Sequence, residues 1–493
     1  MNVNALPIFR APLATLWALA ALLLASGCFA EQSFPMRTGD VVRTAPDAPG
    51  APISTRRWLV RTHRALRHLL PPGSAEPLLT DDLTDVSGRP MDVFAHFRRN
   101  PVWLQTLLFN YWGLQHSAQC TGRDFDPQSL APPWPGFEEV HIPVSNTLDT
   151  YGWLGMAKNG GAVRDADCIV LLPGFFGYND IKRTNDLAHA LLAAGFHVLA
   201  YENRGYGHTD LAHPEVPYTF GVSETRNLMV VSDWLQDRPH IRRTGLIGFC
   251  WSANQALLAA WYDGCPRTHP SITKNIAAHL PPLPERRRFE AGVIAFSPTL
   301  AYEEIIDKLK TPRNVLKEPV LAVLQETIRK RMADKHYPRP SGNLRQLIDD
   351  EFARSEFSGP KVVHDALRFV RLLPYHGRPA GHKMGCARVP VLIVHASNDP
   401  MGTAEGVADL IARTDNPLVA ALILDGGGHV GFVSYARRYY YSLIINFFDP
   451  QVGAAAATTT RYAKSPFSRD PTGSASATHR LTTKTRRTAA HAR

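Results

Sequence analysis

The feature that most constrains the fold is a series of short aliphatic runs, separated by helical stretches, that begins near residue 167. The runs are uninterrupted rather than alternating with polar residues, which is typical of strands buried on both faces. Such strands, alternating with helices, predict a doubly wound α/β fold with a mostly parallel sheet. The expected strands are residues 169–172, 197–201, 245–247, 292–296, 389–395 and 418–424, and the expected helices are 185–194, 224–235, 252–261, 404–411 and 436–447.

Two further segments are expected to belong to this main domain, which spans residues 136–450. Residues 139–145 and 151–157 flank a turn and predict a β-hairpin. The stretch between the fourth and fifth strands has no strand pattern, and a structureless loop of that length would be unusual in a compact domain. It predicts a helical cap insertion at about 301–385, with helices at 318–332, 344–354 and 362–373.

The N-terminus is typical of an export signal. Arg10 precedes a charge-free run, residues 11–26, which is short for a membrane span. Residues 24–28 resemble a bacterial lipoprotein processing box that would make Cys28 the lipid-carrying first residue, and a plain cut after Ala30 is the alternative. We therefore expect a signal peptide at residues 1–30 and an exported protein of the periplasm or cell envelope.

Between the signal and the main domain we expect a linker and a helical segment. Residues 31–57 are rich in Pro, Gly, Thr and Ala, which is typical of a linker. Apolar residues then recur at helical spacing from Trp58 to about Gln115, so the segment 58–130 is predicted to hold two or three helices packed on the main domain.

The formal charge of +10 does not indicate nucleic-acid binding. Eight basic residues and one acidic residue lie in the tail, residues 451–493, so the tail supplies +7 and the rest of the chain only +3. No zinc-ligand spacing, helix-turn-helix pattern or RNA-recognition motif appears in the sequence. The low-complexity tail is predicted to be disordered, and its charge also suits contact with anionic membrane lipids.

The strongest chemical signal is Gly248-x-Cys250-x-Ser252, where a predicted strand runs directly into a predicted helix. This is the context of a nucleophile elbow, in which small residues on both sides of the nucleophile let strand and helix approach closely. A thiolate at a helix N-terminus has a lowered pKa and attacks acyl carbons. Cys250 is therefore the candidate nucleophile, with catalytically inert packing as the alternative.

Candidate partners follow in the order nucleophile, acid, histidine. Asp399 lies just after the predicted strand 389–395, and His429 lies in a glycine-rich loop after the last predicted strand. The imidazole would deprotonate the thiol, and Asp399 would orient the imidazole. Asp425 is the alternative acid, but Asp399 is favoured because Asp425 lies at the strand end only four residues before His429.

Backbone N–H groups after two strands are candidates for an oxyanion hole. A glycine turn at 172–177 would aim the N–H of Phe175, or of Phe176, at the site, and the N–H of Trp251 would join it. The segment 201–207 is interpreted as a turn that shapes the site. The side chains interpreted as core or strand-edge residues are Cys168, Cys386 and His395.

Together these motifs resemble the α/β-hydrolase superfamily over roughly residues 139–450. The runs 427–432 and 398–400 and Asn254 look like the abhydrolase-domain carboxylesterase branch. The resemblance assigns Cys250, Asp399 and His429 to the triad and Phe175 and Trp251 to the oxyanion hole. Most members have Ser at position 250 and Gly at 252 and 253, whereas Cys at the elbow occurs in dienelactone-hydrolase-like enzymes and polyester synthases.

These residues predict hydrolysis of carboxylic esters or thioesters through an acyl-enzyme, with no cofactor and no metal. The expected partner is a small-molecule or lipid ester substrate, with association to a membrane surface through the N-terminus or the basic tail. A thiol nucleophile also suits acyl transfer, so an acyltransferase of the same fold is one alternative. A catalytically inactive envelope protein that keeps the hydrolase shape is the other.

Overall fold

The computed structural model describes residues 41–44, 54–71, 74–98, 132–314, 317–373 and 383–449. The expected signal peptide, most of the expected linker, residues 99–130 of the N-terminal segment and the basic tail lie outside the described residues. No helix of the described residues is long and apolar enough to cross a membrane.

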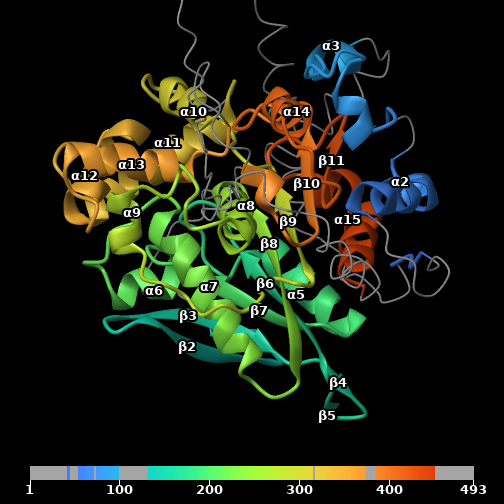
Figure 1. Cartoon of the computed structure of the whole chain (residues 1–493), viewed down its shortest axis with the longest axis horizontal. Coiled ribbons are helices and arrows are strands. Elements are labelled where there is room, and N and C mark those ends of the chain that lie inside the picture. The colour runs from blue at the N-terminus through green and yellow to red at the C-terminus, as the bar shows by residue number, and fades with distance from the viewer. Residues whose placement is uncertain are drawn as a thin grey trace, which may run out of the picture.

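The core of the described chain is a nine-stranded sheet with the order β1-β11-β10-β9-β8-β6-β7-β3-β2 (Figure 1). The six central strands run parallel, which confirms the predicted doubly wound α/β fold. These strands are β6 (Ala166–Leu172), β7 (His197–Glu202), β8 (Ile241–Phe249), β9 (Gly292–Phe296), β10 (Val391–Ala396) and β11 (Val419–Leu424).

Every residue of β6, β7, β9, β10 and β11 is buried, as uninterrupted aliphatic runs require when helices cover both faces of a sheet. At one edge, β2 (Phe137–Ser145) and β3 (Leu148–Gly155) form the predicted hairpin, and β3 pairs antiparallel with β7. Alternate residues of β2 are exposed between Val140 and Ser145, the pattern of an edge strand with one solvated face. A separate small hairpin joins β4 (Lys158–Asn159) to β5 (Ala162–Val163).

Five long helices follow the parallel strands close to their predicted positions: α5 (Lys182–Ala194), α7 (Val222–Gln236), α8 (Trp251–Gly264), α14 (Ala404–Ala412) and α15 (Phe432–Phe448). The sequence analysis missed two short helices, α6 (Gly207–Ala212) and α9 (Lys274–His279), because six residues are too few to show a helical period. A short 3-10 turn, η5 (Lys383–Cys386), precedes β10.

The described part of the N-terminal segment contains two α-helices and adds a strand to the sheet. Its described elements are α2 (Thr55–Leu66), η2 (Arg67–Leu69), β1 (Leu78–Leu79), η3 (Thr80–Leu83) and α3 (Val93–Arg98). β1 pairs antiparallel with β11, a pairing that two residues give no pattern to predict. The last three residues of the predicted linker belong to α2. Within that linker, Val42 donates its N–H to Ser442 Oγ on α15 at 3.0 Å.

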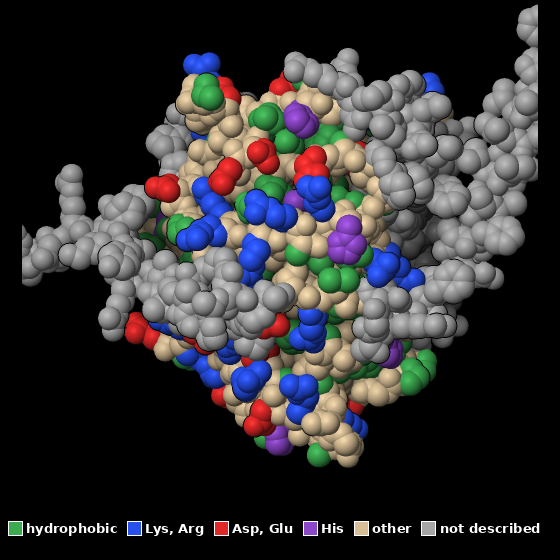
Figure 2. Space-filling view, turned by 90° about the vertical axis from the view of Figure 1, so that its right-hand side faces the viewer, with side chains coloured by type: hydrophobic (Ala, Val, Ile, Leu, Met, Phe, Trp, Pro, Cys, Tyr) green, Lys and Arg blue, Asp and Glu red, His purple; other side chains and the backbone are tan. Residues whose placement is uncertain are grey.

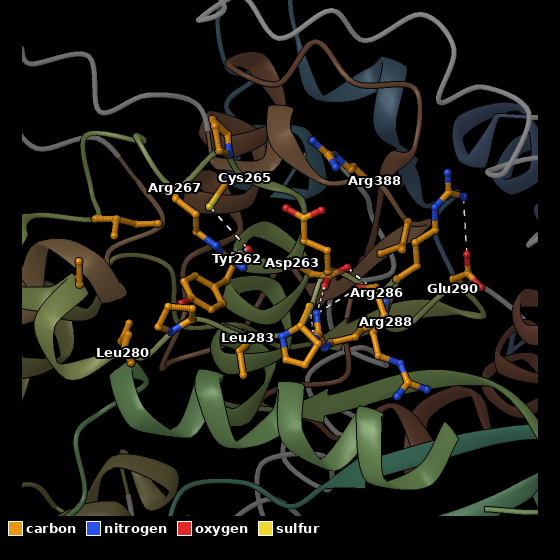
Figure 3. A pocket seen from close by; sticks show the side chains of 18 of the residues that line it. Tyr262, Asp263, Cys265, Arg267, Leu280, Leu283, Arg286, Arg288, Glu290 and Arg388 are labelled. Atoms are coloured by element: carbon orange, nitrogen blue, oxygen red, sulfur yellow. Dashed lines mark hydrogen bonds and ion pairs between the residues drawn. The ribbon is translucent and has the colours of Figure 1, made fainter. Parts of the chain in front are cut away.

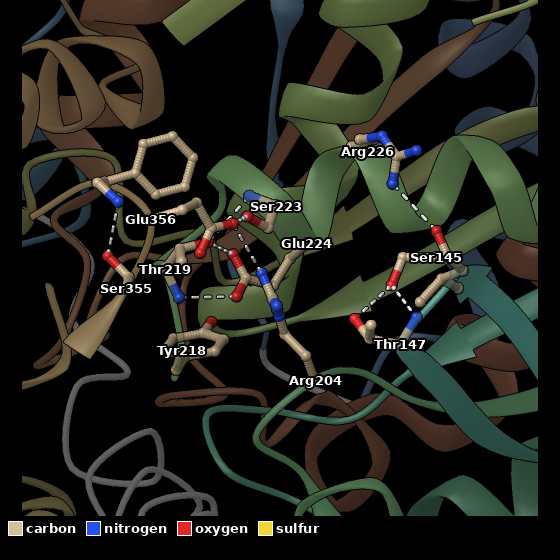
Figure 4. A network of polar contacts seen from close by, with 12 residues as sticks. Ser145, Thr147, Arg204, Tyr218, Thr219, Ser223, Glu224, Arg226, Ser355 and Glu356 are labelled. Carbon is tan, nitrogen blue, oxygen red and sulfur yellow. Dashed lines mark hydrogen bonds and ion pairs between the residues drawn. The ribbon is translucent and has the colours of Figure 1, made fainter. Parts of the chain in front are cut away.

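The insertion between β9 and β10 is helical, as predicted, and consists of α10 (Tyr302–Lys308), α11 (Pro319–Asp334), α12 (Leu344–Arg354) and α13 (Pro360–Val370). Buried ion pairs join it to the main domain. Arg331 of α11 contacts Glu351 of α12 at 2.7 Å and Asp210 of α6 at 3.4 Å, and Glu351 also accepts the N–H of Tyr218. A second network joins Glu356, which follows α12, to Arg204 and Ser223 of the main domain (Figure 4).

The exposed face in Figure 2 mixes basic and acidic side chains, without one sign of charge covering it. This agrees with the small net charge of the chain outside its basic tail.

Candidate active site

The elbow at Cys250 has the strained backbone that its sequence predicts. Cys250 lies between β8 and α8 with φ 57° and ψ −124°, a conformation that non-glycine residues rarely adopt. A Cβ placed on Gly248 would lie 2.3 Å from the carbonyl oxygen of Ser252, so only glycine permits this approach of strand and helix. The Cys250 N–H donates to the carbonyl of Phe296 on β9 at 3.0 Å, which secures the turn.

The loop after β11 brings His429 to this thiol. Gly427 and Gly428 have φ 128° and 58°, and the Gly428 N–H donates to Asn398 Oδ1 at 2.9 Å. On the other side of His429, the Val430 N–H donates to Ser297 Oγ at 3.1 Å. The loop is thus held on both sides of His429, whose imidazole lines the same small cavity as the Cys250 thiol.

The carboxylate of Asp399 contacts the other side of the same imidazole. His429 Nδ1 lies 3.0 Å from both Oδ1 and Oδ2 of Asp399. Oδ1 also accepts the N–H groups of Met401 and Gly402, at 2.8 and 3.2 Å. Burial alone would raise the pKa of Asp399, but the charge of His429 and these hydrogen bonds lower it to about 2.

Of the two candidate acids, the structure therefore brings Asp399 to His429. The carboxylate of Asp425 instead accepts the N–H of Ala75 at 2.9 Å, in the N-terminal segment. Asp399 is the acid that sequence position favoured, although both residues follow strands of the same sheet edge.

The thiol and the imidazole shift each other's pKa in opposite directions. Burial raises the pKa of the Cys250 thiol, but the charge of His429, together with the nearby N–H groups of Phe175 and Trp251, lowers it below its ordinary value. Burial lowers the pKa of His429, but Asp399 and Cys250 raise it above its ordinary value. Each group therefore stabilises the charged form of the other, which favours a thiolate beside an imidazolium.

Two backbone N–H groups near Cys250 contribute to the lowered pKa of its thiol. They belong to Phe175, after β6, and to Trp251, the first residue of α8. The alternative residue Phe176 has φ 51°, and its ring lies 4.2 Å beneath the guanidinium of Arg331 in the cap. The structure thus brings together Cys250, His429, Asp399, Phe175 and Trp251, the five residues proposed from sequence.

Two neighbours of the triad were missed by the sequence analysis. Ser297 lies at the end of β9 and holds the histidine loop through Val430. His395, interpreted from sequence as a core residue, is fully buried 3.9 Å from Asp399 Oδ2, and its Nε2 hydrogen-bonds to the Gly402 carbonyl at 2.8 Å. Both lie at the carboxyl ends of parallel strands, where functional residues of such sheets gather, so their position in the sequence could have identified them as candidates.

The cavity beside Cys250 and His429 has a volume of only about 20 Å³, room for roughly one water molecule. Leu324 of the cap helix α11 and Met401 are among its lining side chains. The cap therefore closes the site in this structure.

A much larger cavity, about 820 Å³, lies away from the triad around the C-terminal end of α8 (Figure 3). The buried Arg288 that lines this cavity is paired with Asp233 and Asp263. Cys265 also lines it, and burial raises the pKa of the Cys265 thiol to about 12. Paired charges and an inert thiol do not indicate chemistry there. Within the described ranges, no three His, Cys, Asp or Glu side chains gather as metal ligands.

Comparison with known proteins bears on the fold and on the family. Residues 169–440 match the alpha/beta hydrolase family. Similar solved structures include the esterase Pf2001 of Pyrococcus furiosus (17% identity, 66% of this chain and 95% of that chain, TM-score 0.39) and Est1E from Butyrivibrio proteoclasticus (15%, 63% and 96%, TM-score 0.36). The alpha/beta hydrolase GrgF from Penicillium sp. sh18 is similar at 16% identity, with 64% and 99% coverage and a TM-score of 0.40.

At such TM-scores these likenesses carry no argument about substrate. No curated protein matches the chain. The family match covers more than half of the 493 residues and contains Cys250, Asp399 and His429. The chain belongs to the alpha/beta hydrolase family.

Proposed function

We propose that the protein hydrolyses carboxylic esters or thioesters through a covalent intermediate on Cys250. The observation that carries this proposal is the geometry of the elbow: Cys250 lies in a strained turn at the start of α8 and shares a small cavity with His429, which is held at 3.0 Å by Asp399. The charge of His429 and the nearby N–H groups of Phe175 and Trp251 lower the pKa of this thiol. A buried thiol that served only as packing would have no need of these partners, and its pKa would be raised, as that of Cys168 is.

In the proposed first half-reaction, the Cys250 thiolate attacks the carbonyl carbon and a C–S bond forms. The negative charge that moves to the carbonyl oxygen is stabilised by the N–H groups of Phe175 and Trp251. When the intermediate collapses, the bond to the leaving group breaks and the imidazolium of His429 gives its proton to the departing oxygen or sulfur. A thioester acyl-enzyme remains.

In the second half-reaction, His429 takes a proton from water and the resulting hydroxide attacks the thioester carbonyl. The C–S bond breaks, the acid product leaves and the thiolate–imidazolium pair is restored. Asp399 keeps the imidazole in the required orientation and stabilises its positive charge throughout.

The first test is the pH dependence of iodoacetamide labelling, with the labelled cysteine identified by peptide mass spectrometry. We expect Cys250 to react below the ordinary thiol range of about pH 8.5, because its pKa is lowered. The half-buried Cys386 is an internal control, since burial raises its pKa and should move its labelling to higher pH.

In His429→Ala the burial of Cys250 remains but the stabilising imidazolium is lost. The pH at which Cys250 is labelled should therefore rise above the pH at which Cys386 is labelled. Equal labelling of both thiols in the wild-type protein, unchanged in His429→Ala, would contradict an activated thiolate and favour the catalytically inactive alternative. Cys250→Ala should then abolish hydrolysis of short p-nitrophenyl esters or thioesters, and full activity in that variant would remove Cys250 from the mechanism.

Acyl transfer is the second candidate, favoured by the exclusion of water from the site. Cys250 is only 7% exposed and the cavity beside it holds roughly one water molecule. Product analysis with an added alcohol separates the two functions, because a transferase would form the new ester in preference to the free acid.

We also propose that the protein is exported, on the basis of the charge-free run 11–26 and the processing sites that follow it. N-terminal sequencing of the protein from its native cell is the test. A mature chain beginning at a lipid-modified Cys28, or at Glu31, supports export, and an uncleaved Met1 opposes it.

A further inference from the structure

One charged side chain of the active-site cavity has no part in the proposed reaction. Arg183 is the second residue of α5, is 4% exposed and lines the same small cavity as Cys250 and His429. Its guanidinium lies 4.5 Å from the ring centroid of Phe249, the residue before the nucleophile. Its Nη1 donates to the carbonyl of Val430, the residue after the histidine, at 3.4 Å.

Arg183 differs from the other buried arginines in having no carboxylate partner. Among the described arginines, three are buried: Arg183, Arg288 and Arg331. Arg288 is paired with Asp233 and Asp263, and Arg331 with Glu351 and Asp210. Arg183 forms no ion pair with any described Asp or Glu, and its buried Nε has no hydrogen-bond partner there.

A buried guanidinium without a counter-ion is costly, because it stays charged and loses its hydration. Its position in the helix adds to this cost. Arg183 lies in the first turn of α5, where the helix dipole is positive and no acidic residue is present, and the N-cap residue Ile181 provides no side-chain acceptor. Helix stability therefore does not explain this arginine, and both the dipole and the guanidinium favour an anion.

We propose that Arg183 binds a carboxylate of the substrate, so that the preferred substrates are esters or thioesters whose acyl or leaving group carries a second, ionised acid group. This rests on the proposed function, because it adds a specificity to the same site. A guanidinium pairs with carboxylate or phosphate alike, and the small free volume beside Arg183 favours the smaller carboxylate.

The first experiment measures the charge preference of the site without any turnover. Iodoacetate and iodoacetamide both transfer a two-carbon group to the Cys250 thiolate with loss of iodide, and only iodoacetate carries a carboxylate. The ratio of their rate constants at Cys250 should fall about tenfold or more in Arg183→Met and stay near the wild-type value in Arg183→Lys, which keeps the charge. His429 is present in all three proteins, so the change in ratio isolates Arg183.

A purely structural arginine predicts a different result. If Arg183 only holds the Val430 loop, Arg183→Met should slow both reagents equally and leave their ratio unchanged, which would overturn the proposal. Protection of Cys250 by glutarate, compared with inorganic phosphate at equal concentration, tests the kind of anion. Stronger protection by glutarate supports a carboxylate site, and stronger protection by phosphate overturns it.

The second experiment compares turnover of monoethyl glutarate with that of ethyl pentanoate, its uncharged counterpart, by titration of the released acid. The wild-type kcat/KM should favour the acidic ester, and the ratio of kcat/KM for the acidic ester to that for the neutral ester should fall about tenfold or more in Arg183→Met and stay near the wild-type value in Arg183→Lys. Cys250-dependent hydrolysis of both esters without preference would overturn the role of Arg183 and leave the proposed function intact. Absence of Cys250-dependent hydrolysis of either would contradict the proposed function, while the alkylation ratio still decides whether Arg183 binds the anion.

Discussion

At the residue scale, the chemistry of the candidate site depends on charges that stabilise one another. Asp399 holds a positive charge on His429, and that charge stabilises the Cys250 thiolate. Each group is buried, so removing one member leaves the next without compensation in a low-dielectric environment. The effect of Asp399 on the thiol is therefore indirect but should be large.

Replacing Asp399 with Asn should lower kcat by about 100-fold or more, because the imidazolium loses its counter-charge and its orientation. The pH profile of Cys250 alkylation should move to higher pH in the same variant. Asp425→Asn is the matched control, since Asn retains an oxygen to accept the Ala75 N–H. The assignment fails if Asp425→Asn loses as much activity as Asp399→Asn.

At the element scale, the elbow depends on the close approach of β8 and α8. The atoms that crowd Gly248 belong to the backbone of Ser252 and Ala253, which cannot rotate away as a side chain would. Gly406 in α14 offers a contrast, because a Cβ there would meet its nearest neighbour at 3.5 Å, an ordinary contact.

Gly248→Ala should lower the free energy of unfolding by about 3 kcal/mol, because strand and helix must separate. Gly406→Ala should leave it unchanged or raise it by up to about 1 kcal/mol, since alanine favours a helix. Urea denaturation of both variants measures these changes. Equal stability of the two proteins would show that the elbow tolerates a side chain at 248.

The cap helix α11 determines how much space the substrate has. Leu324 lines the cavity beside Cys250, whereas Ile328, one turn later and fully buried, does not. Access of a long acyl chain therefore requires space that Leu324 now occupies.

Leu324→Ala should raise kcat/KM for p-nitrophenyl octanoate relative to p-nitrophenyl acetate, because the deleted atoms enlarge the cavity. Both Leu324→Ala and Ile328→Ala should lower the free energy of unfolding by about 2–5 kcal/mol, which is typical of such truncations. Only Leu324→Ala should change the chain-length preference. The same shift of preference in both variants would mean that general loosening of the cap, and not the space at Leu324, sets the specificity.

At the scale of the whole molecule, the N-terminal segment is part of the hydrolase body. Trp58 of α2 is 1% exposed and packs edge-on against Phe447 of α15, with ring centroids 5.3 Å apart. β1 completes the sheet beside β11, and Asn446 of α15 binds Val42 and Thr44. These contacts link residues separated by more than 300 positions in the chain.

Trp58→Ala should therefore lower the stability of the whole domain by about 3–5 kcal/mol and shift a single unfolding transition. Val60→Ala, at a half-buried position of the same helix, should cost about 1 kcal/mol. Circular dichroism during urea denaturation measures both. A separate early transition in Trp58→Ala would mean that the segment unfolds independently of the sheet.

The sequence by itself determined the features that depend on neighbouring residues. Aliphatic runs identify buried strands because each strand needs only its own residues to be apolar. The elbow is equally local, since Gly248, Cys250 and Ser252 lie within one turn of chain, and the order of Cys250, Asp399 and His429 follows from the order of the strands.

Only the tertiary structure decided the features that depend on distant pairs. The sequence favoured Asp399 and Phe175, but the contact of Asp399 with His429, and of Asp425 with Ala75 instead, depends on where the loops fold in space. No sequence pattern shows that Arg183 is buried without a carboxylate partner. Nor does the sequence show that it donates to the carbonyl of Val430, which lies 247 positions later in the chain. Hydrogen bonds, burial and missing counter-charges are properties of contacts between distant segments, and a local pattern of residue types does not record them.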